Sequence, residues 1–298
     1  MSSKNGMLTW VWGPVMWYVL HYLSFRYPKN PSHKEKILYR TFIEYLEFVL
    51  PCGACRTNFH SNIHENPLKD ADLEDRCGFA AWVYNFHNCV NKMTKNSLYV
   101  APSFDEVVQT YTDPLFFDAC VSIHIIPKTK SDQHNIITKC GNLELVNYSK
   151  TDTIGLPFWF VLLCIGFNYP FEPTIEQQSA YEIFFDTSFR IFEMLTKVHI
   201  QDIKTNRSCF NSRLSFSTHI VNLLCSYSNE TYDYQMIRKF IEKFRAKCDN
   251  KNKASSVESG CVNILSGKKC QATILIQPRH GSCMDFLNSV RVSSECYK

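Results

Sequence analysis

Hydrophobic and polar residues recur with the period of an α-helix over most of residues 1–112. The stretch from Met7 to Phe25 has no Asp, Glu, Lys or Arg, and it predicts a buried helix over residues 8–27. Ser32, with Glu35 three residues later, has the pattern of a capping box, and the helix that it opens should end at about Leu50. Three more helices are predicted over residues 52–63, 78–94 and 104–111.

The uncharged stretch is almost long enough to cross a membrane, but its composition favours a buried helix. It contains Gly13, Pro14 and His21, and the cleavage site of a signal peptide does not follow it. A second apolar run, from Leu156 to Phe167, is too short to span a bilayer. We therefore expect neither a membrane span nor a secretion signal, and a cytoplasmic protein.

The pattern changes after residue 112. Residues 113–149 carry prolines and short β-branched runs, which predict a linker that could hold short strands. Helical periodicity returns in a second region, residues 150–250, and the last region, residues 251–298, is a cysteine-containing tail with one strand-like run. The predicted fold class is mainly α: a four-helix bundle plus a short fifth helix over residues 1–112, followed by a mostly helical second domain.

Composition narrows the function classes. The net charge is +4, from 32 basic and 28 acidic residues, and no block of Lys and Arg stands out. A nucleic-acid-binding groove is therefore not expected. The chain has 14 cysteines, which could form a disulfide framework, act as a redox relay or simply be small buried residues.

The candidate chemistry centres on residues 51–55, Pro-Cys-Gly-Ala-Cys. Pro51 ends the preceding helix, and a helix that starts at Cys52 would stabilise a thiolate there. A Cys-x-x-Cys pair serves either redox exchange or half of a zinc site. Because no second such pair exists in the sequence, the spacing favours redox exchange.

Three motifs give residues 1–112 a resemblance to the Erv/ALR family of FAD-linked sulfhydryl oxidases. They are Gly13-Pro14-x-x-Trp17-x-x-x-His21 followed by Tyr27-Pro28, the pair Cys52 and Cys55, and Phe79-x-x-Trp82-x-x-x-x-His87-Asn88-x-x-Asn91. The resemblance is strongest to the enzymes of large cytoplasmic DNA viruses. It implies a helical FAD-binding domain, electron transfer from dithiol substrates, and dioxygen as the acceptor that becomes hydrogen peroxide.

The resemblance also implies roles for individual residues. Cys52 would exchange with the substrate dithiol, and Cys55 would pass electrons to the flavin. Residues that would contact FAD are Gly13, Trp17, His21, Asn58, Trp82, His87, Asn88, Asn91, Lys92 and Lys95. For Trp17 the alternative is ordinary core packing, and for the two lysines it is a solvated face. No metal site is expected.

Two family positions differ in this chain. Many members have a structural disulfide where this sequence has Tyr84 and Glu106, so both partners are missing together. The segment 96–103 is also longer than usual, which leaves the adenine side of the pocket as the least defined part. A shuttle disulfide, if one exists, would come from the tail cysteines: Cys261, Cys270, Cys283 and Cys296.

The chain also resembles itself. At one constant offset, Gly13, Trp17, Tyr27, Pro28, Tyr39 and Phe42 match Gly155, Trp159, Tyr169, Pro170, Tyr181 and Phe184. The same offset places Leu163, Met194 and Lys197 at the positions of His21, Cys52 and Cys55. We therefore interpret residues 150–250 as a degenerate copy without the redox pair. Such a copy could occupy the position of a dimer partner, with convergent helical hairpins as the alternative.

Three function classes stay open at this point. The first is an FAD-dependent thiol oxidase acting on protein or small dithiols, as a homodimer or an intrachain pseudo-dimer. The second is a non-enzymatic interaction or scaffold protein that kept the helical bundle, and the third is a zinc-binding module. Flavin absorbance and oxygen consumption with a dithiol separate the first from the others, and metal analysis separates the second from the third.

Overall fold

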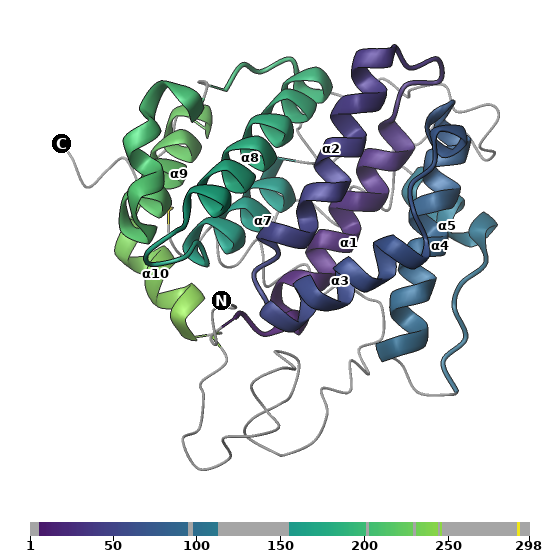
Figure 1. Cartoon of the computed structure of the whole chain (residues 1–298), viewed down its shortest axis with the longest axis horizontal. Helices are drawn as coiled ribbons and strands as arrows, with labels where there is room; N and C mark the ends of the chain where they lie inside the picture. Colours follow the sequence, from purple (N-terminus) through teal and green to yellow (C-terminus); the bar gives the residue numbers. More distant parts are fainter. Residues whose placement is uncertain are drawn as a thin grey trace, which may run out of the picture.

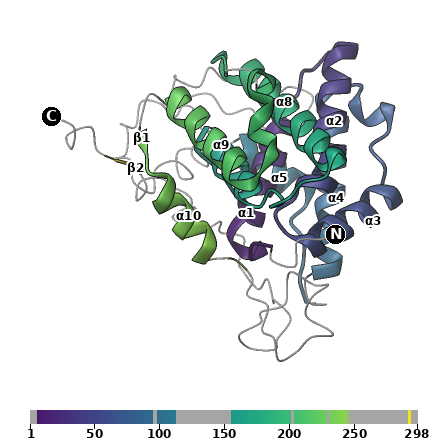
Figure 2. The ribbon, with the colours of Figure 1, turned by 60° about the vertical axis from the view of Figure 1, so that its left-hand side comes forward.

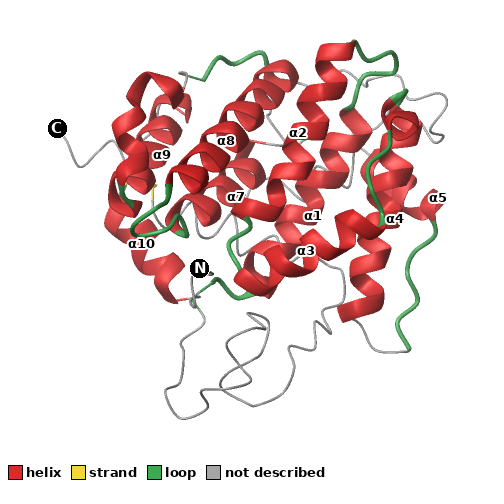
Figure 3. Ribbon diagram, viewed as in Figure 1, coloured by secondary structure: helices red, strands yellow, loops and turns green. Residues whose placement is uncertain are grey.

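The computed structural model describes residues 6–94, 98–112, 155–200, 203–228, 231–243, 245 and 291–292, and most of them are helical (Figure 3). The first group of helices is α1 (Thr9–Arg26), α2 (His33–Val49), α3 (Gly53–Glu65), η1 (Asp70–Leu73), α4 (Arg76–Thr94) and α5 (Phe104–Thr112). The second group is α7 (Gly155–Phe167), α8 (Ile175–Thr196), η4 (Ile203–Asn211), α9 (Arg213–Ser228) and α10 (Tyr234–Lys243). Two short strands, β1 (Thr231–Tyr232) and β2 (Arg291–Val292), pair antiparallel. The predicted mainly α fold class is confirmed, whereas the linker 113–149 and nearly all of the tail 251–298 lie outside the described residues.

Local sequence signals fix the helix boundaries of the first group. The Ser32 hydroxyl accepts from the backbone N–H of Glu35, and the Glu35 carboxylate accepts from the backbone N–H of Ser32, so the predicted capping box is present. Ser103 and Glu106 make the same pair of contacts at the start of α5. Both helices start where the sequence predicts because the caps satisfy backbone donors that the helix itself leaves free.

Helix α1 is the uncharged stretch, and it lies at the centre of the molecule. It packs on α4 and α5 of its own group and on α7 of the second group. Most of its side chains are buried, including Val11, Val19 and Leu23, which explains why it needs no polar face. The predicted buried helix is confirmed. Among the described residues, no helix combines the length and hydropathy that a membrane crossing requires.

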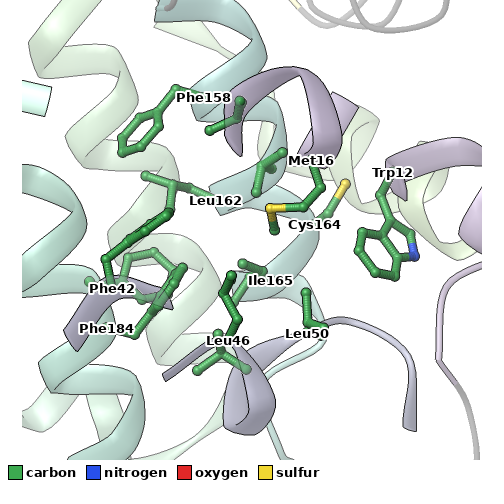
Figure 4. Close-up of a cluster of buried hydrophobic side chains, with 14 of the residues drawn as sticks. Trp12, Met16, Phe42, Leu46, Leu50, Phe158, Leu162, Cys164, Ile165 and Phe184 are labelled. Carbon is green, nitrogen blue, oxygen red and sulfur yellow. The ribbon is translucent and has the colours of Figure 1, made fainter. Parts of the chain in front are cut away.

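The two groups of helices lie side by side and share one core (Figures 1 and 2). Helix α8 packs along α2, and α7 packs against α1. Figure 4 shows side chains of all four helices converging at this contact, among them Met16, Leu46, Leu162, Ile165 and Phe184. The helices that self-comparison of the sequence aligns, α1 with α7 and α2 with α8, therefore pack on each other, which is the arrangement expected of a two-fold dimer.

One hydrogen-bonded tyrosine occurs in the same setting in both groups. The hydroxyl of Tyr27 donates to the carbonyl oxygen of Leu73 at 3.0 Å, and that of Tyr169 donates to the carbonyl oxygen of Phe210 at 2.7 Å. An arginine from the first turn of the following long helix, Arg76 or Arg213, donates in turn to the carbonyl of that tyrosine. Each tyrosine also meets a second buried tyrosine edge-on, with ring centroids 4.7 Å apart, in the pairs Tyr27–Tyr39 and Tyr169–Tyr181.

The groups differ where the redox pair lies. Helix α8 continues to Thr196, past the position that corresponds to Cys52, and Met194 lies inside it. Lys197 then ends the helix in the left-handed conformation, with φ of 61°. The described residues between α8 and α9 contain η4 but no counterpart of α3. The internal duplication therefore stays a prediction, supported by the tyrosine–arginine networks and limited to the helices around them.

Candidate active site

Cys52 and Cys55 form a disulfide at the start of α3. Cys52 is the N-cap residue, and its sulfur lies 3.3 Å from the backbone nitrogen of Cys55, which donates to it. A helix N-terminus and a backbone donor both stabilise negative charge on sulfur. The predicted position of the pair at a helix start is confirmed, and the arrangement suits thiol–disulfide exchange, which proceeds through thiolates.

The segment before α1 covers Cys52. The Met7 backbone nitrogen donates to the carbonyl oxygen of Pro51 at 2.7 Å, and a Cβ added to Gly6 would lie 2.7 Å from the Cα of Cys52. Cys52 is 0% exposed as a result. Met7 also forms a bridge with Arg245, just beyond α10, so the second group of helices holds the covering segment in place. Sequence reasoning did not anticipate this cover.

Thr9, the first residue of α1, adds a hydroxyl to the redox pair. Its Oγ1 lies 3.5 Å from the sulfur of Cys55 and 4.0 Å from that of Cys52. Because disulfide sulfurs carry no hydrogen, the hydroxyl is the donor. Gly13 lies one turn further on, and a Cβ there would come within 3.1 Å of the Thr9 methyl carbon, so the glycine leaves room for the threonine. Sequence reasoning missed Thr9.

The apolar core next to the pair encloses a narrow cavity without room for a water molecule. Its wall consists of Trp17, Leu20, Ile43, Leu46, Phe59, Trp82, Val83 and Phe86, which come from α1, α2, α3 and α4. Phe59 follows Cys55 by four residues on α3, so both side chains are on the same helical face. Helical spacing therefore favours Cys55 as the sulfur on the cavity side, and Trp17 and Trp82 line the cavity, while their contact with FAD stays a prediction.

The motif residues of α1 and α4 meet at one edge of this cavity. The rings of Trp17 and His87 stack with centroids 3.8 Å apart and planes 9° from parallel. His21 Nε2 lies 3.0 Å from His87 Nδ1 in a hydrogen bond. Burial lowers the pKa of His21 to about 3, so this imidazole is neutral at physiological pH. The structure thus brings together motif residues that lie in two separate parts of the sequence.

Two buried nitrogens near the cavity lack hydrogen-bond partners within the described residues. They are the Nδ1 atom of His21 and the indole nitrogen of Trp82. A buried polar atom without a partner costs about 1–3 kcal/mol, so a ligand that paired with these two nitrogens would relieve that cost. A flat apolar wall with polar atoms at its edge is what an isoalloxazine ring needs.

The remaining predicted contacts are divided between this site and the surface. Asn91 is buried on α4, with its amide nitrogen 3.4 Å from the Tyr99 hydroxyl, and Asn88 is half-buried. Lys92 is exposed on α4, and Lys95 lies outside the described residues. Asn58 is exposed on α3 and does not line the cavity, because the opposite face of this helix turns inward. The contacts of Asn58 and both lysines with FAD stay predictions.

The position of the family's structural disulfide is filled by other contacts. The hydroxyl of Tyr84 donates to the carbonyl oxygen of Pro102 at 2.8 Å, and its ring lies 5.3 Å from that of Phe104. Glu106 caps α5 through Ser103 instead of bridging to α4. Packing and hydrogen bonds therefore join α4 and α5 at the positions where many members of the family that the sequence resembles have a disulfide.

Comparison with known proteins agrees with this geometry. Residues 14–109 match the model of the Erv1/Alr family. A protein of Acanthamoeba polyphaga mimivirus named as a probable FAD-linked sulfhydryl oxidase is 33% identical over 103 residues, which are 35% of this chain and 72% of that protein. FAD-linked sulfhydryl oxidases of Arabidopsis thaliana and Saccharomyces cerevisiae are 29% and 31% identical, over 27% and 29% of this chain. The matches cover only 40% and 43% of these two relatives.

Proposed function

Because the chain belongs to the Erv1/Alr family, we propose that it is an FAD-dependent thiol oxidase that forms disulfide bonds in dithiol substrates. The observation that carries the proposal is the Cys52–Cys55 disulfide at the start of α3, beside an aromatic cavity. A scaffold protein would have no need for a disulfide with a backbone donor and a hydroxyl on its two sulfurs. A zinc module would need further ligands close to these thiols.

The residues around the cavity fit FAD. Trp17, Trp82 and His87 supply flat faces, and the unpartnered nitrogens of His21 and Trp82 supply polar contacts. Asn88 and Asn91 follow on α4 toward the adenine end of the proposed site, with Lys92 on the exposed side. The cavity has no room for a water molecule, and the rings of Trp17 and His87 stack on each other, so these side chains would have to move apart to admit the ring system.

The chain's own cysteines carry the exchange steps. A substrate thiolate attacks Cys52, the Cys52–Cys55 bond breaks, and Cys55 leaves as a thiolate beside the Thr9 hydroxyl. The second substrate thiolate then attacks the substrate sulfur of the mixed disulfide and releases Cys52. The substrate gains a disulfide, and the pair gains two electrons. When bound, FAD supplies the two-electron acceptor that restores the pair and delivers electrons to dioxygen, which gives hydrogen peroxide.

Substrate access requires that the cover over Cys52 moves. The sulfur is fully buried under Gly6 and Met7, whereas thiol exchange needs an in-line approach to it. A protein substrate that displaces this short segment could gain backbone contacts at Pro51 in its place. Protein dithiols are therefore the proposed substrate class. The viral relative supports action in the cytoplasm of an infected cell or in the virion.

The second group of helices is proposed to be an inactive copy in the place of a dimer partner. Its counterpart of His21 is Leu163 and its counterpart of the cavity residue Ile43 is Phe185, and both are fully buried. Phenylalanine is larger than isoleucine, so the second group would have less room at this position. The domain division 1–112, 113–149, 150–250 and 251–298 is part of this proposal.

Purified protein tests the proposal directly. We expect bound flavin, oxygen consumption with dithiothreitol and an equal amount of hydrogen peroxide. Cys55→Ser and Cys52→Ser should each reduce turnover by at least about 100-fold while flavin stays bound. Cys89→Ser, which removes a free thiol on α4, is the matched control and should keep full activity. A colourless protein that consumes no oxygen would rule out the oxidase.

A further inference from the structure

Two histidines and a glutamate form a cluster on the surface, apart from the proposed oxidase site. His60 and His64 are one turn apart on α3, and Glu47 faces them from the end of α2. One candidate ligand atom from each residue lies within 4.8 Å of the others. The two imidazole rings have centroids 4.2 Å apart, since residues four apart are neighbours on the surface of a helix.

Hydrogen bonds already orient both rings. His64 Nδ1 lies 2.8 Å from the carbonyl oxygen of His60, and because a carbonyl only accepts, this nitrogen carries the hydrogen. His60 Nδ1 lies 2.6 Å from a carboxylate oxygen of Glu47, which likewise accepts. Each ring has two nitrogens, so one can bind a metal ion while the other keeps or loses its present contact. Metal-binding histidines characteristically make such a contact from the nitrogen that does not bind the metal, as His64 does, whereas the contact between His60 and Glu47 would give way to the ion that both residues bind.

We propose that Glu47, His60 and His64 bind a divalent transition-metal ion, with Zn²⁺ as the best match. Imidazole nitrogen favours zinc and its neighbours in the first transition series over Ca²⁺ and Mg²⁺, which prefer oxygen. Two histidines and one glutamate form a known three-ligand zinc set, with water at the fourth position. His60 and His64 are exposed, so small side-chain rotations bring three ligand atoms to the roughly 2 Å that zinc requires.

A metal ion at this site would link two helices that flank the redox pair. Glu47 precedes the Pro51–Cys55 turn and His60 follows it, so a bound ion would link α2 to α3 on the two sides of the redox pair. A ligand that binds only the folded chain stabilises it in proportion to the logarithm of its concentration over Kd, once that ratio is well above one. We therefore expect zinc to raise the Tm of the protein and to hold this turn more rigidly. The inference does not depend on the oxidase proposal, because it rests on no cysteine.

Zinc titration of the full chain, with the pair oxidised and accessible thiols alkylated, tests the site. The wild type should bind one more equivalent of Zn²⁺ than His60→Ala/His64→Ala, and Glu47→Gln should weaken binding about tenfold to 100-fold. His199→Ala is the matched control, because His199 pairs with Glu193 at 2.8 Å on the surface. It should bind zinc as the wild type does.

The result that overturns the proposal is equal zinc stoichiometry in the wild type and the double variant. An equal loss of binding in the His199 control would overturn it too, since zinc would then bind histidine-containing surface in general. The circular dichroism spectrum checks folding, and alanine at two exposed helical positions should preserve it. A zinc-dependent rise in Tm that is present in the wild type and absent from the double variant is the second expected readout.

Discussion

Phe42 of α2 stacks on Phe184 of α8, the residue that self-comparison of the sequence aligns with it, with ring centroids 5.4 Å apart (Figure 4). In a dimer with two-fold symmetry, only residues on the axis contact their own copies. Under the proposed duplication, the contact would mark the position of an approximate two-fold axis between the two groups of helices. Both rings are almost completely buried, at 2% and 0% exposed.

Removing a ring at this contact should destabilise the whole chain. We expect Phe42→Ala to lower the free energy of unfolding by about 3–5 kcal/mol, because it leaves a cavity in a core that both groups share. Phe48→Ala on the same helix is the control, since Phe48 is 51% exposed, and it should cost less than about 1 kcal/mol. Urea unfolding gives both values. Equal effects would show that the contact between the groups contributes little.

The buried tyrosines offer a test of the repeated network. Tyr27→Phe and Tyr169→Phe each remove one hydroxyl donor and leave a carbonyl oxygen, that of Leu73 or Phe210, without it. Each variant should lose about 1–3 kcal/mol of stability, and the two losses should be similar. Tyr45→Phe is the control, because this ring is only partly buried against the core. A large loss in one half and none in the other would contradict equivalent networks.

Stability should fall on acidification because of His21. Its pKa is about 3 in the folded protein and 6.5 in the unfolded chain, so the unfolded state binds more protons between these values. Above pH 6.5, His21 is neutral in both states and does not lower the free energy of unfolding. As the pH falls from 6.5 toward 3, His21 lowers the free energy of unfolding by at most about 1.4 kcal/mol per pH unit. His87 and Tyr111 pack against the ring, and neither supplies a negative charge that would favour the protonated form.

The variant His21→Leu isolates this effect, since leucine is the residue at the counterpart position and is buried there. Below pH 6.5, the ordinary histidine pKa, the stability of this variant should depend less steeply on pH than the stability of the wild type does. Thermal unfolding at a series of pH values provides the comparison. Identical slopes in the two proteins would mean that His21 can be protonated without unfolding.

The cover over Cys52 should control how fast the disulfide reacts. In Gly6→Ala the new Cβ would lie 2.7 Å from the Cα of Cys52, a distance that backbone atoms do not tolerate, so the segment must shift outward. We expect the variant to be reduced faster by dithiothreitol in a stopped-flow experiment under anaerobic conditions. Gly78→Ala, another tight glycine remote from the pair in sequence, controls for general loosening of the fold. An unchanged rate would show that the cover is not limiting.

Sequence patterns anticipated the local features and missed those formed by distant segments. The Ser32–Glu35 cap and the helix start at Cys52 depend on residues a few positions apart, so they could be predicted. The cover of Cys52 by Gly6 joins two distant parts of the sequence through backbone packing, and no residue pattern encodes it. Self-comparison matched Phe42 with Phe184, but it could not tell that the two rings touch.

Thr9 is expected to tune Cys55 once the pair is reduced. Its hydroxyl lies 3.5 Å from the Cys55 sulfur. A hydrogen bond from this hydroxyl would stabilise a thiolate more than a neutral thiol, so it should lower the pKa of this cysteine. Thr9→Val keeps the shape and removes the donor, and it should raise the Cys55 pKa by about one to two pH units. Thr9→Ser keeps the donor and should leave the pKa close to that of the wild type. The ultraviolet absorbance of the thiolate, measured against pH in the reduced Cys52→Ser background, gives the pKa of Cys55. Identical titration curves for the valine and serine variants would assign Thr9 a packing role alone.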